Sequence, residues 1–340
     1  EISEYGQKYA EELNKKYSKN FDEDFPKFNF LYRKRTWNPS EKCYLGWERK
    51  RGLLCEFNEF LINGTDHFRA NSIVGAGDPQ NKIKYVITLD ADTNLVLESA
   101  TQLIGSMAHI LNEPVLSKNK DVVIDGHGII QPRIGIDLEA SRKSLYTKIY
   151  AGLGGTDLYA NAISDIYQDN FDEGIFTGKG IYDLEVFHKV LSNQIPDNTV
   201  LSHDLLEGSY LRCGLATDIL LIDGTPSKYN SYLQRESRWR RGDWQILSWL
   251  GGKVKLKNGT KKINPLNTLS KFKILDNLRR SLLPVSILLG LIISVFLKLF
   301  TDISTWQIVT ICLVAYSFSP ILDIINYIIF KKGKRGRSST

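Results

Sequence analysis

Two long apolar segments near the C-terminal end constrain this 340-residue chain most strongly. Residues 282–300 (LLPVSILLGLIISVFLKLF) and 306–330 (WQIVTICLVAYSFSPILDIINYIIF) each have about the ~20 residues with which a helix crosses a bilayer. Only TDIST separates them, so we predict two transmembrane helices at 281–330 that form a hairpin. A pair of helices buried in a protein core is the alternative.

Basic residues at both outer ends of this hairpin indicate its orientation. KFKILDNLRR precedes the first segment and KKGKRGR follows the second, and Lys and Arg cluster on the cytoplasmic side of membrane helices. We therefore expect residues 251–280 to form a basic interfacial linker, residues 331–340 to form a basic cytoplasmic tail, and the preceding domain to face the cytoplasm.

The net charge of +6 does not indicate a nucleic-acid partner, because most of it lies in the tail. Removing the five basic residues of the tail leaves about +1 for everything else. They are Lys331, Lys332, Lys334, Arg335 and Arg337. Beside a membrane segment, such a cluster is predicted to face the lipid bilayer.

Strand-like and helix-like segments alternate through residues 30–250. Residues 85–89 are apolar and β-branched, residues 97–111 have apolar side chains at helical spacing, and residues 215–223 again resemble a strand. This alternation predicts an α/β fold with a mostly parallel sheet covered by helices. Residues 1–29 are expected to form a helical N-terminal segment with a tether, which begins inside a longer protein.

Two aspartates, Asp90 and Asp92, follow the first of these strands directly in YVITLDADTN. Ligands of α/β sheets bind at the carboxyl ends of strands, and Mg2+ or Mn2+ prefers one or two protein carboxylates together with phosphate oxygens. The pair therefore predicts a divalent metal site. Acidic pairs also cap helices, and Asp92 precedes a helix expected to open near Val96, so a structural role is the alternative.

Three further motifs follow in order: FTGKG at 176–180, SHDLLEG at 202–208 and QRESRWRRGDWQ at 234–245. In this order, ahead of apolar segments, they resemble motifs of processive family 2 glycosyltransferases of the cellulose synthase type, which have a GT-A fold. The sequence is also similar to the family 84 glycosyltransferase domain of cyclic β-1,2-glucan synthases. The segments that carry this similarity are GWERKRG, QPRI, FTGKGIYDLEVFH, LSHDLLEG and RWRRGDWQ. The resemblance runs from about Phe30 to Gln245 and implies a GT-A-like domain at 30–250.

This resemblance implies an inverting glucosyltransferase that transfers glucose from UDP-glucose to a growing β-1,2-glucan, with Mg2+ or Mn2+ as cofactor. It also implies a multi-pass protein of the bacterial inner membrane. A synthase of the cellulose, chitin or hyaluronan type is one alternative, because the linkage rests on resemblance alone. A non-catalytic membrane fragment is another, because no apolar strand for the nucleotide base is evident in residues 1–29. No oligomeric state follows from the sequence.

The resemblance also assigns the catalytic base. Inversion in one displacement requires a group that takes the proton of the acceptor hydroxyl, and Asp204 of SHDLLEG matches that position. The alternative is that Asp204 caps the helix that opens there. Glu207, one helical turn further on, is the rival carboxylate, and His203 is a candidate third metal ligand.

Basic residues are implied to bind the donor diphosphate. Lys50 and Arg51 in GWERKRG resemble the diphosphate loop of family 2, and Arg238 matches the arginine that lies beside the diphosphate. The resemblance also implies that Asp90 helps to bind the diphosphate, through the metal ion that it coordinates. As a plain run of charges, ERKR is also typical of a solvated surface.

Residues of the acceptor site are implied as well. Trp239 matches the tryptophan that stacks under the acceptor sugar, although it could instead anchor the chain at a membrane interface. The acceptor loop FTGKG supplies Phe176, Thr177, Gly178 and Lys179, because its glycines allow close backbone approach. A simple turn is the alternative for this loop.

Overall fold

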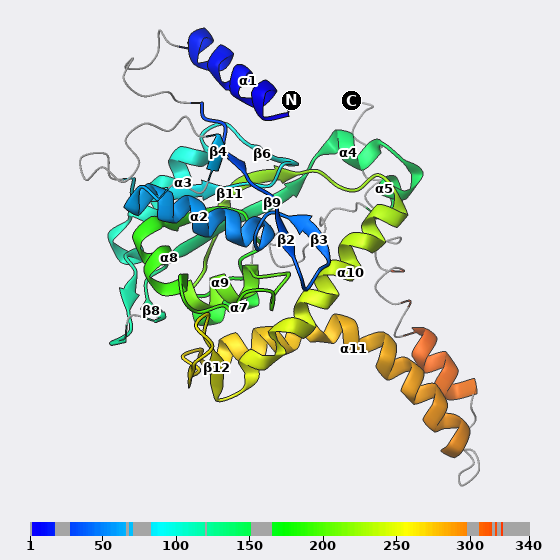
Figure 1. Cartoon of the computed structure of the whole chain (residues 1–340). Coiled ribbons are helices and arrows are strands. Elements are labelled where there is room, and N and C mark those ends of the chain that lie inside the picture. The colour runs from blue at the N-terminus through cyan, green and yellow to red at the C-terminus, as the bar shows by residue number, and fades with distance from the viewer. Residues whose placement is uncertain are drawn as a thin grey trace, which may run out of the picture.

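A mixed five-stranded sheet forms the centre of the protein (Figure 1). The structure, a computed structural model, describes residues 2–17, 28–65, 68–70, 83–119, 121–150, 165–297, 306–314, 317 and 321. The strand order is β5 (Tyr85–Thr88), β10 (Gly180–Asp183), β9 (Ile129–Ile136), β11 (Gly214–Asp223) and β6 (Thr93–Leu95).

The α/β class is confirmed, but the expectation of a mostly parallel sheet is wrong for the described strands. Only β9 and β11 run parallel, and the other three neighbouring pairs are antiparallel. Alternation of strands and helices predicts parallel neighbours only if every connection returns the chain to the same end of the sheet. Here the segment before β10 enters the sheet from the opposite end.

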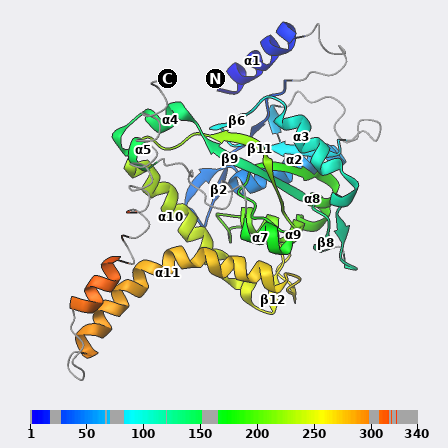
Figure 2. The same ribbon diagram turned by 180° about the vertical axis from the view of Figure 1, so that it is seen from behind.

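Helices cover both faces of the sheet. Along β9, Ile129 packs on one face and Ile130 on the other, because successive strand residues point to opposite sides. On the Ile130 side lies α3 (Ser99–Ala108), which contributes the fully buried Leu103. On the Ile129 side lie α8 (Leu184–Leu191) and α9 (Asp204–Leu211), so α3 and this helix pair sandwich the sheet (Figures 1 and 2).

Two helices and a hairpin lie beside the sheet (Figure 1). The helices are α2 (Arg49–Asn63) and α10 (Tyr229–Gln245), and the antiparallel hairpin consists of β2 (Thr36–Asn38) and β3 (Cys43–Leu45). The remaining elements are α1 (Ile2–Tyr17), β1 (Tyr32–Arg33), β4 (Phe68–Ala70), η2 (Ile110–Asn112), β7 (Val115–Leu116), β8 (Val123–Asp125), α4 (Leu138–Arg142), α5 (Leu145–Tyr150), α7 (Ile166–Phe171), η3 (Ile246–Leu250), β12 (Lys253–Lys255), β13 (Lys261–Ile263) and α11 (Thr268–Leu297).

The long helix α11 is attached to the domain by its first half. Ile274 and Leu278 are buried there, and the buried ammonium of Lys273 donates to the backbone oxygens of Glu173 (3.4 Å) and Gly174 (3.0 Å) and to the Glu173 carboxylate (3.2 Å). The second half extends away from the domain (Figure 2).

Over the residues that the structure describes, no helix combines the length and the apolar character needed to cross a membrane. The transmembrane hairpin predicted at 281–330 is therefore not supported. Most of its second segment lies outside the described residues, as do the predicted tail at 331–340 and residues 18–27 of the N-terminal segment.

Candidate functional site

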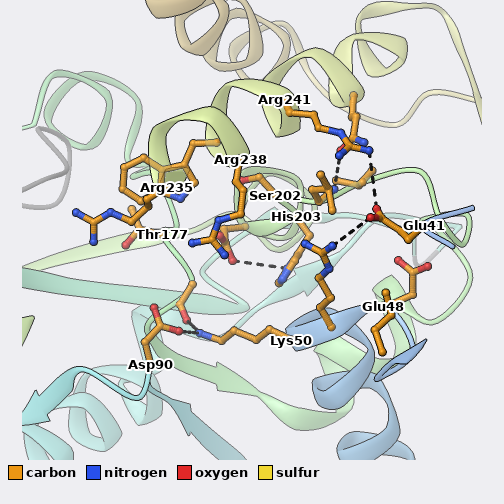
Figure 3. A pocket seen from close by; sticks show the side chains of 18 of the residues that line it. Glu41, Glu48, Lys50, Asp90, Thr177, Ser202, His203, Arg235, Arg238 and Arg241 are labelled. Carbon is orange, nitrogen blue, oxygen red and sulfur yellow. Dashed lines mark hydrogen bonds and ion pairs between the residues drawn. The ribbon is translucent and has the colours of Figure 1, made fainter. Parts of the chain in front are cut away.

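A cavity of about 440 Å³ lies where the ends of β5 and β11 meet α2, α9, α10 and the β2–β3 hairpin (Figure 3). It gathers most of the residues that the sequence motifs indicated, although they come from distant parts of the chain. These are Lys50, Asp90, Asp92, Thr177, Gly178, Lys179, Asp204, Arg238 and Trp239.

Strand register brings the acceptor loop to the aspartates. Because β10 pairs antiparallel with β5, the start of β10 lies beside the end of β5, and Gly180 is opposite Thr88. Lys179 and Asp90 continue outward from this pair, and the Lys179 Nζ lies 3.3 Å from Asp90 Oδ2. The antiparallel pairing that the sequence analysis missed thus joins two motifs that lie far apart in sequence.

Two ammonium groups hold the Asp90 carboxylate. Lys50, in the first turn of α2, lies with its Nζ 2.5 Å from Asp90 Oδ1 and 2.7 Å from the backbone oxygen of Gly178. Lys179 contacts the other carboxylate oxygen. Burial acts to raise the pKa of Asp90, but Lys50 and Lys179 outweigh it and hold the pKa below its ordinary value.

A third carboxylate, Asp223, belongs to this cluster and was not singled out from the sequence. It ends β11 and pairs in register with Thr93 of β6, whose hydroxyl donates to Asp223 Oδ1 at 2.6 Å. Its other oxygen accepts from Lys179. The position of Asp223 at the end of a predicted strand was the signal that would have identified it.

The donor set at these strand ends suits a divalent cation, because the carboxylates of Asp90, Asp92 and Asp223 all line the cavity. A helix-capping role for Asp92 does not fit, since β6 intervenes and α3 begins only at Ser99, with Glu98 as its N-cap. A cation bound to Asp90 would compete with the ammonium groups of Lys50 and Lys179 for the same oxygens.

The backbone of the acceptor loop closely approaches Asp204, the first residue of α9. Gly178 has a φ of +89°, and a Cβ at this position would lie only 2.7 Å from Asp204 Oδ1. A side chain at this position would therefore be strained by the backbone conformation and would displace the Asp204 carboxylate. Within the described residues, no side-chain capping bond is made by the N-cap of α9, and the Asp204 carboxylate instead faces the loop and the cavity.

The two rival carboxylates of α9 differ in position. Asp204 lines the cavity, whereas Glu207 is 1% exposed and does not line it. Between them, His203 Nδ1 lies 2.8 Å from Glu207 Oε1 and 3.6 Å from Asp204 Oδ1. Burial acts to lower the pKa of His203, but the negative charges of Glu207 and Asp204 raise it to about 9.

Helix α10 presents three arginines to the cavity at successive turns, namely Arg235, Arg238 and Arg241. Arg235 lies over the indole of Trp239, 5.0 Å from the ring centroid. Its buried Nε and Nη2 atoms have no hydrogen-bond partner among the described residues. Arg235 therefore adds a partly buried cation to the cavity.

The β2–β3 hairpin contributes Glu41, which the sequence analysis did not single out. Its carboxylate lies 3.4 Å from Arg49 and 3.8 Å from Arg241, and so connects the hairpin to α2 and α10 across the cavity (Figure 3). No motif marked Glu41, because its role depends on a tertiary contact between three separate elements.

Two of the residues assigned by resemblance do not line the cavity. Arg51 is 5% exposed, and its guanidinium pairs with Glu48 at 2.6 Å. The side chain of Phe176 is 2% exposed and packs in the main core beside α9. In this structure, both lie behind the cavity wall.

We predict that Lys50→Met raises the pKa of Asp90, because it removes one of the two cations that favour the carboxylate. A depressed folded-state pKa contributes stability above the unfolded pKa and loses it as the pH falls through the folded value. The loss of unfolding free energy in Lys50→Met should therefore be largest near neutral pH and shrink in acid. Carboxyl NMR and urea unfolding measure both effects.

The exposed Lys34 provides the matched control, since Lys34→Met removes a positive charge that does not line the cavity. An Asp90 pKa that is the same in Lys50→Met and Lys34→Met would contradict the assignment.

No family model matches the chain. It is 37% identical over 330 residues to the cyclic beta-(1,2)-glucan synthase NdvB of Rhizobium meliloti (strain 1021). The match covers 97% of this chain but only 11% of that protein, so the chain spans about a ninth of the length of its relative. The resemblance indicated by the sequence motifs is thereby confirmed, and the chain is related to a part of a cyclic glucan synthase.

Proposed function

We propose that this domain is the GT-A-like catalytic part of an inverting glucosyltransferase that uses UDP-glucose to extend a β-1,2-glucan. One observation carries the proposal: the cavity unites carboxylates at the strand ends, cationic side chains and the loop-facing Asp204. Such a site can bind a sugar nucleotide, neutralise its diphosphate and accept a proton from an incoming hydroxyl. The similarity to a cyclic glucan synthase supports glucose as the sugar.

The cationic side chains stabilise the leaving group in this mechanism. As the bond between the anomeric carbon and the diphosphate oxygen breaks, its electrons pass to the diphosphate. Lys50, Lys179, Arg235 and Arg238 line the cavity and can neutralise this developing charge. A divalent cation held by Asp90 and Asp92 would supply further positive charge to the diphosphate.

Asp204 acts on the acceptor. The acceptor hydroxyl oxygen forms the new bond to the anomeric carbon on the face opposite the leaving diphosphate, and its proton passes to the Asp204 carboxylate. One displacement of this kind inverts the anomeric centre, which converts an α-linked donor into a β-linked product. The indole of Trp239 offers an apolar face for a pyranose in the same cavity.

Asp204→Asn is expected to leave UDP-glucose affinity within about threefold but to reduce turnover by roughly two to four orders of magnitude, the range for loss of a general base. Equilibrium binding of UDP-glucose and transfer from radiolabelled UDP-glucose measure the two quantities. Asp218→Asn is the control, because Asp218 is exposed and does not line the cavity. Undiminished polymerisation by Asp204→Asn would assign the base elsewhere.

Asp92→Ala is expected to weaken binding of Mn2+ and to abolish sugar transfer without altering the circular dichroism spectrum, because a metal carboxylate ligand is lost. Asp218→Ala again serves as the control. Turnover that survives both Asp92→Ala and EDTA would show that the site works without the metal.

Product analysis distinguishes the related alternatives. Methylation analysis that finds β-1,2 linkages supports the cyclic glucan assignment, whereas another linkage indicates a synthase of the cellulose, chitin or hyaluronan type. Complete absence of transfer, together with no binding of UDP, would indicate a non-catalytic domain.

The proposal includes a bilayer contact for the second half of α11, at the inner membrane of a bacterium. The support is an apolar surface that the domain itself does not cover. Its side chains are each between 41% and 61% exposed, and they are Leu282, Leu283, Val285, Leu288, Leu289, Ile292, Ile293 and Phe296.

Replacing Leu288 and Leu289 together by serine is expected to reduce binding to phospholipid vesicles by at least about tenfold, because burial of each leucine contributes ~1.5–3 kcal/mol. Flotation with vesicles measures the bound fraction. Leu97 and Leu138 are exposed leucines of the main domain, and their joint replacement by serine is the control. Equal flotation of both variants would contradict the bilayer contact.

A further inference from the structure

The N-terminal turn of α9 contains a buried ion pair that the proposed mechanism does not use. His203 is the N-cap residue and Asp204 the first helical residue, and Glu207 lies four positions after the one and three after the other, so its side chain is within reach of both. The imidazole lies between the two carboxylates, with Nδ1 2.8 Å from Glu207 and 3.6 Å from Asp204.

Exposure decreases from the cavity inward along this row of three groups. The Asp204 side chain is 28% exposed, that of His203 8% and that of Glu207 2%. Glu207 therefore cannot act on a substrate directly, but it contacts the residue that lies behind the proposed base.

A buried carboxylate such as Glu207 is costly unless a cation is close to it. His203 is the group in position to supply that charge, since its Nδ1 lies 2.8 Å from Glu207 Oε1, and the two neighbouring carboxylates raise its pKa. Arg51 of α2 also acts on His203 and lowers its pKa, and its own guanidinium pairs with Glu48. Glu207 thus fixes the imidazole of His203, whose Nδ1 also faces the carboxylate of Asp204.

The opposite side of the same Asp204 oxygen is also constrained. Oδ1 faces His203 Nδ1, and the space on the loop side is so narrow that a Cβ on Gly178 would lie 2.7 Å away. The carboxylate of Asp204 therefore lies between the imidazole of His203 and the backbone of the acceptor loop.

We propose that the His203–Glu207 pair is a positioning device for Asp204: Glu207 holds the imidazole ring of His203, and this ring orients the Asp204 carboxylate toward the acceptor hydroxyl. This inference rests on the proposed function of Asp204 as the base. The same three residues also offer ligand atoms within 4.8 Å of one another, so a metal site is the competing explanation.

The test combines a spectroscopic and a kinetic measurement on Glu207→Gln and His203→Gln. Histidine NMR of the parent protein should show His203 protonated on both ring nitrogens at neutral pH, and Glu207→Gln should lower its titration midpoint by at least about one pH unit. Both variants should reduce kcat by about 10- to 100-fold, as expected for a misplaced catalytic group, with KM for UDP-glucose within about threefold.

His188 and Glu59 provide a matched control, because they form a second His–Glu contact at 3.4 Å that is more exposed and does not line the cavity. Glu59→Gln should leave kcat unchanged. The double variant His203→Gln/Glu207→Gln replaces the ion pair by two neutral amides, and it should fold even if the burial of one unpaired charge unfolds a single variant. Its kcat should remain reduced.

Three results would overturn the proposal: a neutral His203 in the parent protein, full kcat in the folded double variant, or displacement of the His203 proton by added Mn2+ or Zn2+. The last result would establish a metal site instead. The NMR measurement needs no substrate, so a parent protein that transfers no sugar yet holds a protonated His203 would disprove the proposed function and leave the ion pair in place.

Discussion

The antiparallel pairing of β10 with β5 is the constraint on which the site depends. It places Gly180 opposite Thr88, so that the loop before β10 and the turn after β5 emerge at the same edge of the sheet. The parallel pairing of β9 with β11, and the pairing of β11 with β6, bring Asp223 to this edge as well. A slip of one residue in the register of any of these three pairings would turn the side chains of the shifted strand to the opposite face.

The charges at this edge compensate one another before any substrate enters. Lys50 bridges Asp90 and the backbone of Gly178, while Lys179 bridges Asp90 and Asp223. Partly buried charges are stable in such a cluster because each has a counter-ion within contact distance. The same groups are then arranged in advance for a ligand that carries both negative charge and a bound cation, which limits the reorganisation that binding requires.

The sequence predicted local features better than tertiary ones. The strand before Asp90, the helix within residues 97–111 and the helix that opens at Asp204 were all expected, because each depends on the sequence within one segment. Strand direction was mispredicted, because it depends on how distant segments pair. Asp223 and Glu41 were missed for the same reason, since their partners lie on other elements.

The anchor of α11 has a mechanical consequence. The Lys273 ammonium donates hydrogen bonds to Glu173 and Gly174. Only three residues, Ile175, Phe176 and Thr177, separate this contact from Gly178 at the cavity. Ile175 and Phe176 are buried in a close-packed interior, which transmits displacement rather than absorbing it. A displacement of α11 at Lys273 is therefore expected to reach the loop beside Asp204 through two buried residues, so the position of the long helix and the shape of the cavity are mechanically coupled.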